Sequence, residues 1–234
     1  FLQVGINFNN TVSISGGNKL SQSYFSYGNT QASGMIPNNK FSRHAFNYRN
    51  NFNFFKGILE LNFSANYVKQ ESNNNPTSGY FGNPIYNLYL MPRNADIRYF
   101  KKNQETYGNL YALDKSNWNS DGTPRKIGEG PIQVWPWQNE GNSPYWIQNR
   151  INNTTHIERF YTNIGAKVNI AKGLSAQVRF NFDTSKNSST GETWHGTKGK
   201  NVYNSVYYNG ANTDTQTFGD ILVNYDKKIG DFDL

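Results

Sequence analysis

Apolar and polar side chains alternate without a break from Leu59 to Tyr67. Alternation with a period of two places successive side chains on opposite faces of an extended strand, so it predicts a β-strand with one apolar and one polar face. Similar alternation predicts strands at residues 4–14, 23–30, 43–54, 158–170, 174–183 and 217–226, and another strand is expected to begin near Asp231. The sequence therefore predicts an all-β protein with about eight strands.

The predicted strands are unusually long for a soluble protein. They run to about 9 to 13 residues, whereas strands of globular proteins usually have about 5 or 6. A tilted strand that crosses a bilayer needs about 9 to 11 residues, with an apolar face toward lipid and a polar face toward a watery interior. The charged residues Arg49, Glu60, Lys167, Arg179 and Asp183 all fall on the predicted polar face. We therefore expect an antiparallel transmembrane β-barrel segment.

Short and long connections alternate between the predicted strands. Short turns are expected at residues 16–18, 55–57, 171–173 and 227–230, and long connections at 31–42, about 69–157 and about 184–216. In an up-and-down membrane barrel the tight turns face the periplasm and the long loops face the outside. Aromatic residues near strand ends, such as Tyr67, Phe54, Phe55 and Phe182, are expected to form girdles at the two membrane interfaces.

The composition agrees with strands and turns. Aromatic residues make up 16% of the chain, and the mean hydropathy of −0.79 is low because half of each strand and every loop would be wet. The net charge of +7 is spread along the sequence, so no nucleic-acid partner is expected. Cysteine is absent, which excludes disulfides and cysteine-based zinc sites. No stretch resembles a transmembrane helix, and since Phe1 is not an initiator methionine we expect an internal piece of a longer protein.

Catalytic chemistry has little support, so we expect no enzymatic activity, no cofactor and no metal. The histidines His44, His156 and His195 are scattered and belong to no hydrolase or metalloprotease motif. Four acidic residues of the large loop could offer calcium oxygen ligands, but no EF-hand series is present. They are Asp114, Asp121, Glu129 and Glu140. We expect these carboxylates to be solvated.

Aromatic residues gather in the predicted large loop. They include Trp118, Trp135, Trp137, Trp146, Tyr80, Tyr86, Tyr89 and Tyr99. They could stack on sugar rings or contact a partner, with Arg93 or Asn139 setting orientation. Alternatively they form the small core that a loop of this length needs, which is the more economical interpretation. As candidate ligand or partner contacts we select Trp135, Trp137, Trp146, Tyr89 and Arg93.

Four segments resemble the SusC/RagA-like TonB-dependent transporters of Bacteroidetes outer membranes. Residues 9–54 are similar to that family's strand, Ser-Gly-Gly turn, strand, Ile-Pro-Asn loop and following strand. Residues 89–100, YLMPRNADIRYF, resemble its aromatic-Pro-Arg-x-x-Asp segment. Residues 142–183 resemble its Asn-Pro-Tyr-Trp stretch and hairpin, with Ser143 in place of the Asn, and residues 221–234 resemble a later hairpin. The order and spacing of these segments cover nearly the whole chain.

The resemblance implies a barrel of 22 strands, of which residues 1–234 supply about a third, without the plug domain or the TonB box. It implies a bacterial outer-membrane location and active import of glycans or peptides. The implied partners are a SusD-like surface lipoprotein that closes over the barrel, TonB acting through a region absent from this chain, outer-membrane lipid, and oligosaccharide or peptide cargo. Ligand would be captured outside, the lipoprotein would close, and TonB would move the plug.

The main alternative is a soluble, secreted all-β carbohydrate-binding module, which would also be rich in Tyr, Trp and Asn. A secreted glycan hydrolase ranks third. A barrel segment should fractionate with outer membranes and need detergent, whereas a binding module would stay in buffer.

Overall fold

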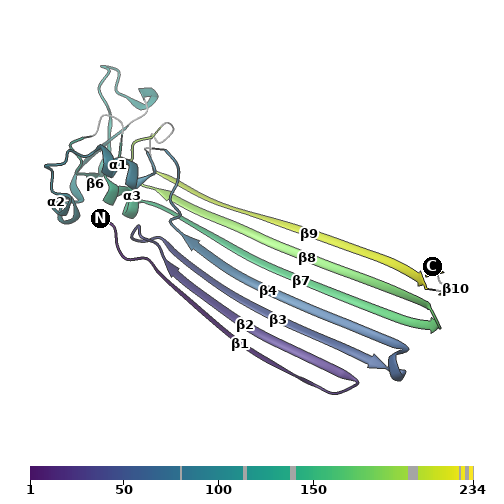
Figure 1. Ribbon diagram of the computed structural model, residues 1–234. Helices are drawn as coiled ribbons and strands as arrows, with labels where there is room; N and C mark the ends of the chain where they lie inside the picture. Colours follow the sequence, from purple (N-terminus) through teal and green to yellow (C-terminus); the bar gives the residue numbers. More distant parts are fainter. Residues whose placement is uncertain are drawn as a thin grey trace.

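The computed structural model describes residues 1–79, 81–112, 115–137, 141–199, 205–226, 228–229 and 232–233. Seven antiparallel strands form one sheet in the order β1-β2-β3-β4-β7-β8-β9, so the chain adds its strands one after another (Figure 1). The strands are β1 (Ile6–Gly17), β2 (Ser21–Ser33), β3 (Lys40–Phe54), β4 (Leu59–Asn73), β7 (Ile151–Ala171), β8 (Leu174–Thr193) and β9 (Val206–Tyr225). The predicted antiparallel β architecture is confirmed. The sheet is open, with β1 and β9 at its edges.

The predicted eighth strand differs from the structure. Two short strands, β10 (Lys228–Ile229) and β11 (Phe232–Asp233), pair with each other and not with β9. Asp231, near which that strand was expected to begin, lies outside the described residues. None of the helices in the described part of the chain combines the length and the apolarity needed to cross a membrane.

All the tight turns lie at one end of the sheet, here called the turn side, and all the longer connections at the other, the loop side (Figure 1). The turn-side connections are residues 18–20, the 3-10 helix η1 (Phe55–Gly57) with Ile58, and residues 172–173. Gly173 adopts a φ of +79°, and a Cβ there would come within 2.0 Å of the Asp226 carbonyl oxygen, so this turn requires glycine. The predicted sorting of short and long connections is thus present in the structure.

Apart from a register shift between Asn169 and Ala171 at the end of β7, the strands pair in continuous register, so alternate residues of all seven strands share a face. One row across β3, β4, β7, β8 and β9 consists of Phe52, Leu61, Ala166, Val178 and Ile221. We call this side of the sheet the apolar face and the opposite side, which carries Arg49, Lys167 and Asp183, the polar face. The assignment of Glu60 and Arg179 to the polar face is confirmed as well.

The apolar face consists of five successive rows in which most side chains are apolar. The row nearest the turn side is Phe54, Leu59, Val168, Ala176 and Val223, and the fifth is Phe46, Tyr67, Phe160, Thr184 and Thr215. The fifth row continues through Tyr27 of β2 to Val12 of β1, so four neighbouring strands present aromatic rings side by side. The Tyr27 and Phe46 ring centroids are 4.8 Å apart and those of Phe46 and Tyr67 are 6.3 Å apart. We call this the aromatic row.

The next row toward the loop side is polar on every strand. It consists of Asn10, Asn29, His44, Lys69, Glu158, Lys186 and Thr213. We call it the charged row after Lys69, Glu158 and Lys186. Asn10, which interrupts the apolar pattern of its strand in the sequence, belongs to it. The apolar face ends at this level on β2, β3, β4 and β7. On β9 Thr217 and Thr215 already replace apolar side chains in the two preceding rows, and on β1 Phe8 and Ile6 follow beyond Asn10 on the same face.

Asn50 is the main polar exception inside the apolar rows. It is only 6% exposed, and its Nδ2 donates to Ser23 Oγ at 2.7 Å and to Tyr48 OH at 3.2 Å. Ser21 Oγ donates to Asn50 Oδ1 at 3.4 Å. These contacts hide the amide among its neighbours, which offsets the cost of placing a polar group in an apolar surface.

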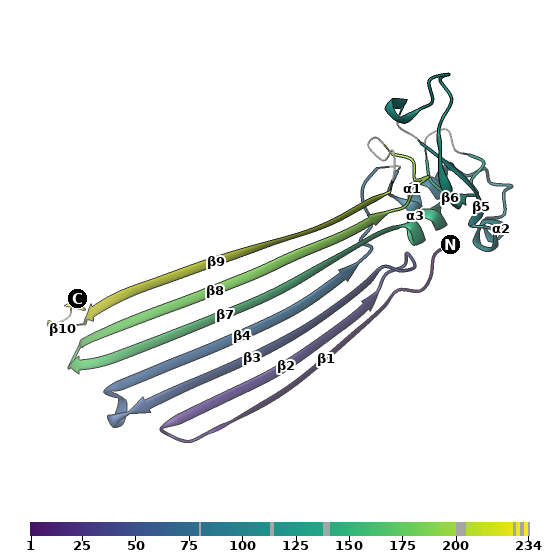
Figure 2. The ribbon, with the colours of Figure 1, turned by 180° about the vertical axis from the view of Figure 1, so that it is seen from behind.

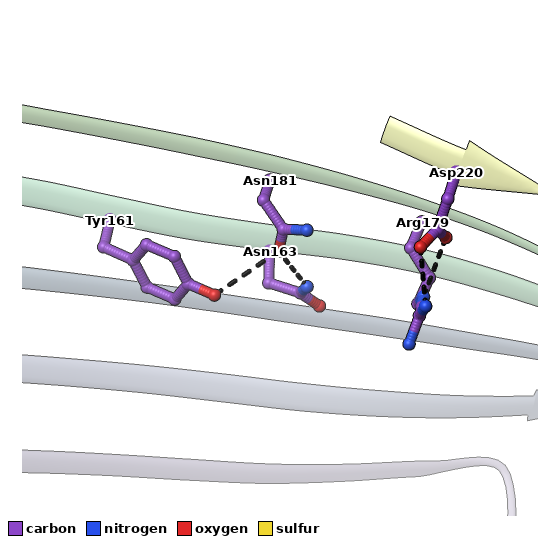
Figure 3. A network of polar contacts seen from close by, with 5 residues as sticks. All are labelled: Tyr161, Asn163, Arg179, Asn181 and Asp220. Carbon is purple, nitrogen blue, oxygen red and sulfur yellow. Dashed lines mark hydrogen bonds and ion pairs between the residues drawn. The ribbon is translucent and has the colours of Figure 1, made fainter. Parts of the chain in front are cut away.

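Polar side chains on the opposite face bond to one another across strands. Arg179 donates to both carboxylate oxygens of Asp220, at 2.8 and 2.6 Å, and Arg159 pairs with Asp183. Figure 3 shows that Asn181 accepts hydrogen bonds from both Tyr161 and Asn163 beside the Arg179 pair. Such cross-strand pairs stabilise the sheet while keeping the face hydrophilic.

The buried apolar core lies outside this sheet. Among the described residues, the buried hydrophobic side chains are Phe100, Ala112, Trp135, Tyr145, Trp146 and Ile147, all of which belong to the segment between β4 and β7. By contrast Val178 is 50% exposed and Ile221 is 74% exposed. The sheet is thus held by its hydrogen-bonded ladder, and none of the described residues forms a layer over its apolar face.

Candidate functional site

The loops beyond the loop side fold together into one body, visible beside the N-terminus at one end of the sheet (Figures 1 and 2). We call the described residues within 34–39, 74–150 and 194–199 the loop unit. It contains α1 (Pro84–Leu90), α2 (Ile97–Lys102), β5 (Glu105–Tyr111), η2 (Lys115–Asn117), β6 (Lys126–Gln133) and α3 (Pro144–Arg150). The strands β5 and β6 form their own two-stranded sheet. The predicted large loop therefore has regular structure of its own.

Local sequence explains where its short helices begin. Asn83 caps α1 by accepting hydrogen bonds from the backbone N–H groups of Ile85 and Tyr86, and Pro84 suits the first helical position. Asp96 caps α2 by accepting from the Arg98 N–H at 2.9 Å. The Arg98 side chain also bonds this carboxylate and lowers the pKa of Asp96. The Pro-Arg-x-x-Asp segment thus supplies a helix cap.

Aromatic rings form the core of the loop unit. Phe100 contacts both Trp135 and Trp137 edge-on, at centroid distances of 5.3 and 5.2 Å. Tyr145 is buried in the same cluster, and burial raises the pKa of its phenol. Phe1 packs edge-on against Tyr145 at 5.2 Å, which ties the start of the chain to the loop unit.

Asn142 joins three segments at the centre of the loop unit. Its side chain is fully buried, and its Nδ2 donates at 2.8 Å to the carbonyl oxygens of both Phe81 and Lys198. Its Oδ1 accepts from Gln133 Nε2 at 3.0 Å and from the Lys198 N–H at 2.7 Å. Gln133 extends the network by donating to the Gly196 carbonyl at 2.8 Å. One amide therefore connects the large loop with the loop after β8.

Two further contacts attach the loop after β8 to α3. Trp146 Nε1 donates to Thr197 Oγ1 at 2.8 Å, and the Trp146 side chain is only 1% exposed. Arg150 stacks over the Trp194 ring at 4.0 Å and forms an ion pair with Glu105. The guanidinium of Arg150 is thus held by the Trp194 ring and by the Glu105 carboxylate, and it fixes the distance and the orientation of both.

Asparagines attach the β2–β3 loop to the same body. Asn38 Nδ2 donates to the Gln148 carbonyl at 3.2 Å and to Asn149 Oδ1 at 3.0 Å. Asn39 Nδ2 donates to the carbonyls of Asn73 and Asn74. All three loop segments thus form one connected surface at the loop side.

The five candidate contact residues fall into two groups. Trp135 and Trp146 are 2% and 1% exposed, and Trp137 is partly buried against the same core, so a ligand could reach the first two only if the loop unit opened. Tyr89 is 85% exposed, and Arg93 is exposed in the turn after α1. The burial favours a core role for the tryptophans, while Tyr89 and Arg93 remain available to a ligand. Tyr80 and Asn139 lie outside the described residues.

No family model and no curated protein matches the chain. The geometry of the loop unit and of the sheet is therefore the basis of the functional proposal, together with the resemblance of the four sequence segments.

Two of the four acidic residues considered as calcium ligands lie in the described part of the chain, and each has another partner. Asp121 accepts hydrogen bonds from Thr123, and Glu129 forms an ion pair with Lys126 at 2.7 Å. Asp114 and Glu140 lie outside the described residues. In the part of the chain that the structure describes, no three His, Asp or Glu side chains are grouped as metal ligands would be.

The network residues Gln133, Asn142 and Thr197 were not singled out by sequence patterns. Each is polar, stands in an irregular or short element, and is buried through partners from 9 to 63 positions away. The Asn142-Ser143-Pro144 sequence indicates a helix start but gives no sign that the asparagine is buried.

His195 gives the loop unit a predicted pH dependence. It is 8% exposed, its Nδ1 has no hydrogen-bond partner among the described residues, and burial lowers its pKa below the ordinary 6.5. As the pH falls below 6.5, the opened loop takes up a proton at His195 before the closed loop does. The stabilisation of the closed loop is therefore complete above that pH and is lost progressively below it. We expect amide exchange at residues 194–199 to show less protection at pH 5.5 than at pH 7.5, after correction for intrinsic rates.

A matched pair of variants checks this assignment. His195→Gln should remove most of this pH dependence, while His44→Gln, on the strand β3, should leave it unchanged. Equal pH dependence in the wild type and His195→Gln would contradict the prediction.

Proposed function

We propose that the chain is part of the membrane barrel of an outer-membrane importer similar to the SusC/RagA-like TonB-dependent transporters. The observation that carries this proposal is the apolar face, five rows deep and uncovered by the described residues, which the charged row ends on β2, β3, β4 and β7. Lipid accounts for such a face, because hydrocarbon wets the apolar side chains while water wets the polar face.

The depth of the apolar face fits a membrane. Phe46 and Phe54 mark its two limits on β3 and are eight residues apart, which is about 27 Å along a strand at about 3.4 Å per residue. At a tilt of about 40°, this corresponds to about 21 Å along the membrane normal, close to the apolar band of about 25 Å in outer-membrane barrels. The aromatic row at one limit and Phe54 with Phe55 at the other fit the two interfacial girdles.

The open edges support a barrel of more strands than these. In lipid every backbone N–H and C=O needs a partner, and an edge strand leaves half of its groups unpaired. The exposed edges of β1 and β9 would therefore pair with further strands of the complete protein. Since tight turns face the periplasm in such barrels, the loop unit would lie on the extracellular side.

The transport function rests on the resemblance of the four sequence segments together with this arrangement. The proposed activity is TonB-driven import of glycans or peptides, with a SusD-like lipoprotein as lid and with no catalytic step or cofactor supplied by these residues. Tyr89 and Arg93, exposed on the loop unit, are the residues we propose for contact with cargo or lid. Flat aromatic faces and a guanidinium suit either surface.

A soluble carbohydrate-binding module would need another layer over the apolar face. Apolar patches on soluble monomers rarely exceed a few hundred Å², and the loop unit lies beyond the strand ends instead of over this face (Figure 2). The described residues thus offer no cover for it.

Single-cysteine labelling tests the proposal directly. Residues 1–234 contain no cysteine, and any cysteine elsewhere in the complete protein is first replaced by serine. Val178 and Gln177 are neighbours on β8 but point to opposite faces. In the complete protein, in native outer membranes or liposomes, a fluorophore at Val178→Cys should be quenched by brominated lipids. A fluorophore at Gln177→Cys should be quenched by aqueous iodide and not by brominated lipids.

The opposite pattern, or aqueous quenching at both positions, would rule out lipid contact. Recovery of the complete protein in buffer without detergent would also overturn the proposal.

A further inference from the structure

The charged row contains a lysine, a glutamate and a second lysine on three adjacent strands. Lys69 of β4 pairs in register with Glu158 of β7, which pairs in register with Lys186 of β8. Adjacent strands are about 4.8 Å apart, so the two lysines start about 10 Å apart on one face. All three residues point away from the polar face, in the same direction as the apolar rows.

The two lysines are not neutralised by the carboxylate between them. Lys69 Nζ lies 3.8 Å from Glu158 Oε1, a long contact between side chains that are 55% and 45% exposed. Lys186 is exposed and forms no ion pair with a described residue. Lys69, Glu158 and Lys186 together carry a net charge of +1, which favours an anionic partner. Glu71, one row further toward the loop side on β4, contacts His156 Nδ1 at 3.4 Å.

The position of this group relates it to a lipid surface. It lies one row, about 7 Å, from the aromatic row on the loop side of the apolar face. Lysine side chains at such a level lie along the apolar surface and extend their ammonium groups to the interface, where lipid headgroups carry phosphate.

We propose that Lys69 and Lys186 bind the phosphate of anionic lipid headgroups in the loop-side leaflet, while the acyl chains of the same lipids lie on the apolar face. The proposal rests on the lipid contact of that face and adds a class of lipid to it. Glu158 between the lysines weakens the attraction and holds Lys69 in place.

The group could instead serve only the sheet, since opposite charges on adjacent strands stabilise pairing. Only lipid binding predicts a preference for anionic headgroups, so a direct binding measurement separates the two roles.

The experiment uses the complete protein in a neutral detergent. Pyrene-labelled phosphatidylglycerol and pyrene-labelled phosphatidylcholine are titrated separately, with energy transfer from the protein as the readout. The wild type should bind phosphatidylglycerol more tightly than phosphatidylcholine. Lys69→Gln with Lys186→Gln should reduce this preference about fivefold for each lysine removed, the equivalent of about 1 kcal/mol each near a lipid surface.

Arg43→Gln is the matched control, because Arg43 lies beside His44 at the same level but on the polar face. It should leave the lipid preference unchanged. Retention of the preference by the double variant, or an equal loss in Arg43→Gln, would overturn the proposal. If the double variant does not assemble, Glu158→Gln provides the test. This variant should bind phosphatidylglycerol more tightly than the wild type does, and unchanged or weaker binding would refute the proposal.

Two further outcomes are informative. Displacement of the lipid by inorganic phosphate, at matched ionic strength, would indicate a free-anion site and overturn the proposal. If brominated lipids quench the fluorophore at Val178→Cys but the lysine variants leave the lipid preference unchanged, the headgroup proposal is wrong and the membrane function stands. If aqueous iodide quenches the fluorophore at Val178→Cys, the proposed membrane function is itself wrong.

Discussion

Ile164→Arg is expected to prevent assembly of the complete protein in the outer membrane. Ile164 stands in the middle of the five apolar rows, level with Phe63 and Phe180. An arginine on the lipid face near the membrane centre costs about 2 to 4 kcal/mol, so assembled protein should fall at least about thirtyfold relative to unassembled protein. The ratio can be measured from the outer-membrane fraction by heat-modifiable electrophoretic mobility.

Two controls show whether the face, and not the substitution itself, decides the outcome. Ser64→Arg places the same charge within one residue of that level on the polar face and should assemble nearly as well as the wild type. Ile164→Leu keeps the apolar volume and should behave likewise. Equal defects for both arginine variants would mean that the two faces do not differ in environment.

Asn142→Ala is expected to open the loop unit without disturbing the sheet. The variant removes the hydrogen bonds to the Phe81 and Lys198 carbonyls and those from Gln133 and the Lys198 N–H. Each buried group that loses its partner costs about 1 to 3 kcal/mol, so local stability should fall by at least about 3 kcal/mol. Amide exchange of the Lys198 N–H should then accelerate at least about a hundredfold.

Asn109→Ala is the matched control, because Asn109 is an exposed asparagine of the same unit, on β5. It should leave exchange in the loop unit unchanged, and β4 and β7 should stay protected in both variants. Unchanged exchange in Asn142→Ala would show that the network does not hold the loops together.

Strand positions could be predicted from the sequence only where one face is apolar. The 174–183 prediction stops where β8 leaves the apolar rows, yet β8 continues to Thr193. The remainder, such as Ser185 and Lys186, is polar on both faces, so alternation disappears while pairing with β7 and β9 continues. For the same reason β7 begins at Ile151, earlier than the predicted residue 158. The connections between β4 and β7 and between β8 and β9 are therefore shorter than expected.

The residues expected to form girdles do not all lie at the limits of the apolar face. Tyr67 belongs to the aromatic row, and Phe54 stands in the outermost row at the turn side. Phe182, by contrast, lies one row inside the aromatic row, beside Thr162. Phe182 was expected at an interface because the predicted strand ended at residue 183. In the structure β8 continues to Thr193, so Phe182 is not near a strand end.

The candidate contacts show the limit of local patterns. A tryptophan in a long polar loop can stack on a ligand or fill a core, and the sequence around Trp135 and Trp146 is compatible with both. The structure buries them through partners such as Phe100 and Thr197, which are 35 and 51 positions away. Exposure of Tyr89 next to the buried Asn87 is likewise decided by the packing of α1.

The two faces of each strand and the positions of the tight turns follow from the local amino-acid sequence, because both depend on neighbours within a few residues. That the apolar stretches of β2, β3, β4 and β7 end at one level follows from the register between strands, which belongs to the tertiary structure. It also decided which loop residues are buried, because the contacts of Asn142 and Trp146 join segments that are distant in the chain. Those contacts form only when backbone pairing has brought the strand ends together.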